Sequence, residues 1–103
     1  MKIRFLKSAM SDMLEIKRYI SIDNPVAAKR LIKKFKEKTL QLRHHPFSGS
    51  VIPETQESHL RELIVSNYRI MYQISDQYIN VFAVYESHRL FKADNTEIQP
   101  KKI

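Results

Sequence analysis

The stretch RELIVSNYRIMYQISDQYINVFAVY, residues 61–85, decides the fold class of this 103-residue chain. It holds apolar runs rich in β-branched and aromatic residues, separated only by the short polar breaks SN and SDQ. Runs joined by such short turns pair as neighbouring antiparallel strands. We therefore predict a meander of three strands over 59–65, 68–74 and 78–85. The last strand is apolar on both faces, which places it in the interior of the sheet.

A strand and a helical hairpin are predicted upstream of this meander. MKIRFL, residues 1–6, alternates apolar with polar residues and is typical of a short strand. Ser8 would cap a first helix, whose apolar side chains follow at spacings of four, three and four residues. These side chains belong to Ala9, Met13, Ile16 and Ile20.

A second helix is predicted to begin at Asn24 and Pro25, which suit the N-cap and the first helical position. It would run to His45 and end at Pro46, followed by a surface loop around Gly49. The order β-α-α-β-β-β is that of an α+β domain, with a helical hairpin packed on a small antiparallel-rich sheet. We expect one domain over 1–103, with a core over about 1–90 and an irregular basic tail over 91–103.

Composition and charge narrow the class of protein. The chain carries 18 Lys and Arg against 11 Asp and Glu, a net charge of +7, which favours an acidic partner. Most of the second helix's exposed faces are lysine and arginine, either as a solvated surface or as a docking surface for an acidic protein or RNA. There is no cysteine and no apolar run long enough to span a membrane, so we expect a cytoplasmic protein without a membrane partner.

Arg69 is the residue on which the functional interpretation depends. Tyr68 and Ile70 alternate along one face of its strand, and Arg69 stands on the other face. In one interpretation, Arg61, Glu62 and Arg69 form cross-strand ion pairs on a solvent-exposed face. We favour it on frequency, because surface ion pairs are common in proteins and catalytic sets are rare. The other is a set for metal-independent RNA cleavage, with a base, an acid and cations for the phosphate. Its members would be Glu62 or Glu86 as base, His88 as acid, and Arg69 with Arg89 as cations.

Cofactor chemistry has no support in the sequence. His44 and His45 are adjacent and would point apart on a helix, and His59 and His88 have no carboxylate at ligand spacing. A single glycine excludes a glycine-rich phosphate loop. We expect neither a metal nor a cofactor.

The chain resembles the RelE/ParE superfamily of toxins from bacterial type II toxin–antitoxin systems over roughly residues 1–90. The resemblance rests on the order and spacing of four segments. They are YISIDNPVAAKRLI at 19–32, HPFSG at 45–49, RELIVSNYRIMYQI at 61–74 and INVFAVYESHR at 79–89.

This resemblance implies a small basic toxin that is held inactive by a cognate antitoxin, whose acidic segment wraps it. Operator DNA would be bound only through the antitoxin. RelE-like members are ribosome-dependent mRNA endonucleases, whereas ParE-like members bind and inhibit DNA gyrase without catalysis of their own. The segment DNPVAAKRLI, residues 23–32, is typical of the ParE-like branch, and we expect a gyrase inhibitor.

The resemblance also assigns roles to single residues. Arg69 matches an arginine that both branches share, and Arg89 matches the one that helps RelE-like enzymes hold the scissile phosphate. Asn95 stands where those enzymes carry a tyrosine, and their lysine pair ahead of the sheet is absent. Glu86 replaces the histidine of the ParE-like ending, while His88 precedes Arg89.

Two alternatives to gyrase inhibition stay open at this point. The first is an endonuclease that uses Arg69, Arg89 and His88. The second is a non-toxic member that only binds its antitoxin. In the binding interpretations, the antitoxin or the target would be held by Arg61, Arg69 and Arg89. We expect Arg69 to lie in a functional groove and to cut nothing.

Overall fold

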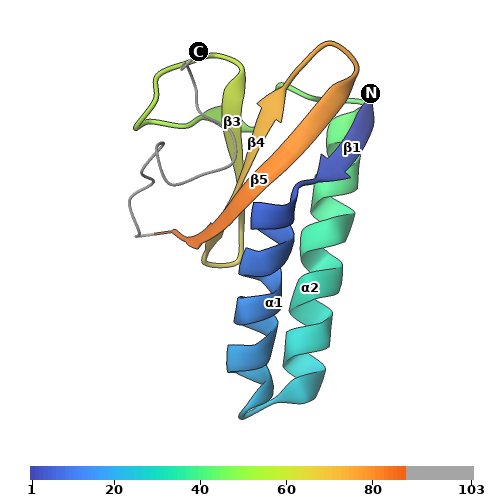
Figure 1. Ribbon diagram of the computed structural model, residues 1–103, viewed down its shortest axis with the longest axis vertical. Helices are drawn as coiled ribbons and strands as arrows, with labels where there is room; N and C mark the ends of the chain where they lie inside the picture. Colours follow the sequence, from blue (N-terminus) through green and yellow to red (C-terminus); the bar gives the residue numbers. More distant parts are fainter. Residues whose placement is uncertain (88–103) are drawn as a thin grey trace.

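The computed structural model describes residues 1–87, and the basic tail expected over 91–103 lies outside them. Two helices lie side by side and pack against a mixed sheet (Figure 1), so the predicted α+β class is confirmed. The bounds of the elements are as follows: β1 Lys2–Phe5, α1 Lys7–Ser21, α2 Pro25–Leu40, the 3₁₀ turn η1 Gln41–Arg43, β2 Ser50–Val51, β3 Leu60–Val65, β4 Tyr68–Ile74 and β5 Tyr78–Glu86.

The sheet has five strands in the order β1-β5-β4-β3-β2. β3, β4 and β5 form the predicted antiparallel meander, and β1 adds to β5 in parallel. β5 therefore lies between two neighbours, as its apolar faces predicted. The paired residues of β1 and β5, such as Lys2 and Tyr78, are 76 positions apart in the sequence, so no local pattern indicated this pairing.

The main core lies between the helices and one face of the sheet. Tyr68, Ile70 and Tyr72 point to this face as their alternation predicted, and the ring of Phe35 from α2 meets that of Tyr68 edge-on at 5.4 Å. The buried members of this core are Ala9, Met13, Phe35, Leu42, Val65, Ile70, Tyr72, Ile79, Val81 and Val84. Met13 and Ala9 confirm the stripe predicted for the first helix.

The opposite face of the sheet, which we call the outer face, carries a second, smaller core. Met71 and Phe82 are buried there beneath Ile52, which is fully buried although it belongs to the expected surface loop. The loop can approach so closely because of Gly49. A Cβ at this position would lie 2.5 Å from the Glu62 carbonyl oxygen and 2.5 Å from the Tyr72 hydroxyl. The prediction of a surface loop was wrong, because this segment also forms strand β2 and its Ile52 is fully buried.

The predicted start of the first helix was also wrong. The helix begins at Lys7 with Leu6 at the N-cap, and the Ser8 hydroxyl donates to the Phe82 carbonyl oxygen instead of capping. The Leu6 N–H donates to the Val81 carbonyl oxygen, so the sheet holds the chain up to the point where the helix starts.

The second helix begins as predicted and ends earlier. Asn24 accepts from the Ala27 N–H at 3.0 Å, with Pro25 in the first position, which confirms the cap. The α-helix ends at Leu40 rather than His45, because its last residues tighten into a 3₁₀ turn, as is common at helix ends. No helix in residues 1–87 is both long and apolar enough to cross a membrane.

Candidate functional site

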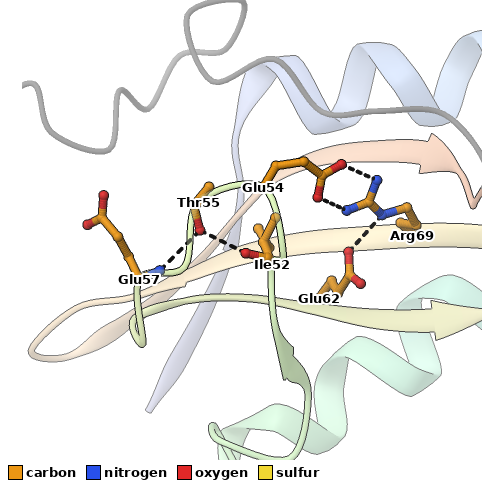
Figure 2. Close-up of polar contacts among 6 residues, drawn as sticks. All are labelled: Ile52, Glu54, Thr55, Glu57, Glu62 and Arg69. Carbon is orange, nitrogen blue, oxygen red and sulfur yellow. Dashed lines mark hydrogen bonds and ion pairs between the residues drawn. The ribbon is translucent and has the colours of Figure 1, made fainter.

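Arg69 lies on the outer face of β4, where two carboxylates hold its guanidinium group (Figure 2). Its Nε donates to Glu62 Oε1 at 2.7 Å, and its two Nη atoms donate to both oxygens of Glu54 at 2.9 and 2.7 Å. Glu62 comes from the neighbouring strand β3 and Glu54 from the loop before it. Only 5% of Arg69 is exposed. Its ion pairs are therefore buried, and not the solvent-exposed ion pairs that are the more frequent arrangement in proteins.

Two carboxylates from the described residues surround this one guanidinium, with N–O distances of 2.7 Å to each. The hydrogen bonds that Arg69 donates to Glu54 are the main cause that raises the pKa of Arg69 above its usual range, although burial opposes them. Bidentate pairing of a guanidinium with a carboxylate is also the geometry in which arginine binds most specifically. The arginine therefore stays charged, and its charge is compensated within the protein.

A local turn presents Glu54 to the arginine. The N–H groups of Thr55 and Gln56 both donate to the Ile52 carbonyl oxygen, which also accepts from the Thr55 hydroxyl at 3.0 Å (Figure 2). The Glu57 N–H in turn donates to that hydroxyl. Because Ile52 is buried, this turn is fixed to the sheet and holds the carboxylate over Arg69.

A pocket of about 380 Å³ opens beside the cluster. Pro53, Ile64 and Ser87 line it together with the three charged side chains. Ile64 is 59% exposed, so the pocket has an apolar rim and a charged floor. The two carboxylates beside the arginine would repel a phosphate group that approached it here.

Arg61 lies apart from this cluster. Arg61 directly precedes Glu62 in β3, so the two side chains point to opposite faces of the sheet. Its Nε donates to the Ser58 carbonyl oxygen at 2.8 Å, and its Nη1 donates to those of Phe47 and Gly49 at 3.2 and 2.9 Å. The guanidinium also covers the Phe47 ring at 4.8 Å. In this structure Arg61 holds the loop against the sheet.

The structure brings only part of the predicted site together. Glu62 and Arg69 meet as predicted, whereas His88 and Arg89 lie outside the described residues. Glu86 ends β5 opposite Tyr68. Within residues 1–87, no group of three His, Asp or Glu side chains is arranged to hold a metal ion.

A second feature was missed by the sequence reasoning. A groove of about 310 Å³ lies along α1, lined by apolar side chains and two lysines. Met10 and Leu14 are 55% and 47% exposed there. Their spacing of four residues, beside the predicted stripe, was the available signal. The groove is lined by Phe5, Met10, Met13, Leu14, Lys17, Ile32 and Lys36.

Comparison with known proteins gives one family and one fold. Residues 3–91 match the family described as the ParE toxin of the type II toxin–antitoxin system parDE. A solved structure titled as the chromosomal ParDE toxin–antitoxin system from P. aeruginosa shares the fold, with a TM-score of 0.69 at 16% identity. The alignment covers 84% of this chain and 95% of that one. No curated protein matches the sequence.

Proposed function

This chain belongs to the ParE toxin family of type II toxin–antitoxin systems, and from that premise we propose that it inhibits DNA gyrase in the cytoplasm. It acts by binding, without chemistry of its own. A cognate antitoxin keeps it inactive, and operator DNA is contacted only by that antitoxin.

The state of Arg69 is the observation that carries this proposal. An RNA-cleaving site needs cations whose charge is available to the phosphate in the transition state. Arg69 donates three hydrogen bonds to two carboxylates and is only 5% exposed. A phosphate approaching this pocket would meet the carboxylates as well as the arginine. This supports the binding protein over the endonuclease, whose remaining candidates are His88 and Arg89.

The α1 groove is the surface that suits the antitoxin best. Exposed apolar side chains that gather in a groove mark docking sites for amphipathic helices. Lys17 and Lys36 flank the groove, so an acidic helix with one apolar face would complement it in shape and charge.

The test uses the purified chain and two reconstituted reactions run in parallel. We expect DNA supercoiling by gyrase to be inhibited, while messages on translating ribosomes stay intact. Message cleavage that Arg89→Ala abolishes would establish the endonuclease instead. Inactivity in both reactions, together with normal growth of cells that express the chain, would leave a protein that only binds its antitoxin.

The antitoxin surface is tested separately. Leu14→Glu places a carboxylate in the groove, and we expect the variant to stay toxic while the co-expressed antitoxin no longer rescues growth. Glu15→Gln, an exposed change at the neighbouring position, is the matched control. Full rescue of the Leu14→Glu variant would refute the groove as the docking site.

A further inference from the structure

Three polar side chains form a ladder across the outer face, at the edge of the sheet away from Arg69. Arg4 Nε donates to Asn80 Oδ1 at 2.9 Å, and Asn80 Nδ2 donates to Gln73 Oε1 at 3.2 Å. These residues belong to β1, β5 and β4, which are consecutive in the sheet. The neighbours of Arg4 and Asn80 along their strands point into the main core, so the ladder lies on the opposite side.

The arginine fixes the direction of every bond in this ladder. A guanidinium has no acceptor, so Asn80 must turn its oxygen toward Arg4 and its amide nitrogen toward Gln73. Gln73 must then accept through its own oxygen. Each amide oxygen thus accepts one hydrogen bond within the ladder, and the groups without a partner there are donors: the Nη atoms of Arg4 and the Nε2 of Gln73. Within residues 1–87 none of these has a protein acceptor, and no ion pair there involves Arg4.

The guanidinium is also held in place before any ligand arrives. Its Cζ lies 3.6 Å from the centre of the Tyr78 ring, so the group is stacked on the aromatic face. Asn80 is only 6% exposed and anchors the Nε edge. Arg4 itself is exposed, and Lys2 lies on the same face of β1 two positions earlier. A positioned side chain loses less conformational entropy on binding than a free one.

We propose that Arg4, Gln73 and Tyr78 form a binding site for a carboxylate side chain of an acidic protein partner. The free edge of a fixed guanidinium matches the two oxygens of a carboxylate in a planar, bidentate arrangement. Gln73 supplies a further donor, because its oxygen is turned toward Asn80. The site has the opposite character to the Arg69 cluster on the same face, where internal carboxylates already occupy the arginine. The inference does not depend on the gyrase target or on the α1 groove.

The probe is a hexaglutamate peptide, titrated into the isotope-labelled chain at about 0.15 M salt, where surface attraction is screened beyond about 8 Å. We expect the NMR signals of the Arg4 Nε–H and the Gln73 side-chain amide to shift with saturation. Arg4→Lys keeps the charge but loses the fork and the bond to Asn80, so affinity should fall by about tenfold or more. Arg18→Lys, at an exposed position on α1, is the matched control and should bind as the unaltered chain does.

A second variant separates a loss of binding from a loss of the fold. Gln73→Glu keeps an acceptor for Asn80 and the side-chain shape, but replaces the outward donors by negative charge. It should also weaken hexaglutamate binding while the spectrum of the fold is retained. The proposal is overturned if Arg4→Lys binds as tightly as the unaltered chain, or if the shifts fall only on the lysines of α2. A hexathymidylate that saturates the same signals more tightly would also overturn it, because a phosphate would then be the ligand.

Discussion

Replacing Arg69 by methionine tests whether this arginine is a structural clamp. Methionine keeps the apolar stem and removes three charge-assisted hydrogen bonds, each worth about 1.5–3 kcal/mol. The side chains of Glu54 and Glu62 are 21% and 11% exposed, so they regain only part of their hydration. Breaking a buried ion pair from one side costs about 3–5 kcal/mol, and we expect Arg69→Met to lie in this range. For a domain of this size, that is a large share of a total of about 5–15 kcal/mol.

The assay is urea unfolding followed by circular dichroism, which gives the free energy of unfolding from the midpoint and slope. Glu57→Gln is the control, because Glu57 lies in the same loop and only approaches His59 at 3.8 Å on the surface. It should change stability by less than about 0.5 kcal/mol. Adding Glu62→Gln to Arg69→Met should recover part of the loss, since the Glu62 carboxylate, whose side chain is 11% exposed, is then replaced by a neutral amide.

Three results would refute this reasoning. A loss of less than about 1 kcal/mol for Arg69→Met would place the ion pairs among weak surface contacts. A variant of full stability that no longer inhibits its target would show that the arginine acts on the partner rather than on the fold. A stability loss without recovery in the double variant would assign the effect to packing alone.

Three further variants test the loop, the buried tyrosine and the helix cap. Gly49→Ala should destabilise the protein by about 2–3 kcal/mol in the same urea assay, because the new Cβ meets two oxygen atoms; an unchanged midpoint would contradict the close approach. Burial raises the pKa of Tyr72 above 10.0, so its contribution to stability is complete below that pH and is lost as pH rises through the folded-state pKa. Tyr72→Phe should therefore flatten the alkaline loss of stability, whereas Tyr19→Phe, at a ring that is 77% exposed, should not. Asn24→Ala should cost about 1 kcal/mol of unfolding free energy, and no change would show that the cap is dispensable.

Local rules predicted most of the elements. The alternation in 68–74 placed Ile70 and Tyr72 in the main core, and the apolar faces of 78–85 placed β5 inside the sheet. Asn24 marked the start of α2. Each of these signals depends on residues within a few positions of one another, so sequence alone carries it.

The chain's tertiary structure decided which groups meet. Sequence could place Glu62 near Arg69 across a tight turn, but Glu54 reaches it only because Gly49 lets the loop lie close to the sheet. Arg4 and Asn80 are 76 positions apart and meet because β1 joins β5 in parallel. Periodicity determined the faces of each element, whereas the partners of each charge depended on how distant segments packed. Whether an arginine is occupied or available for a ligand is therefore a property of the fold, since the acceptors that satisfy it come from other elements.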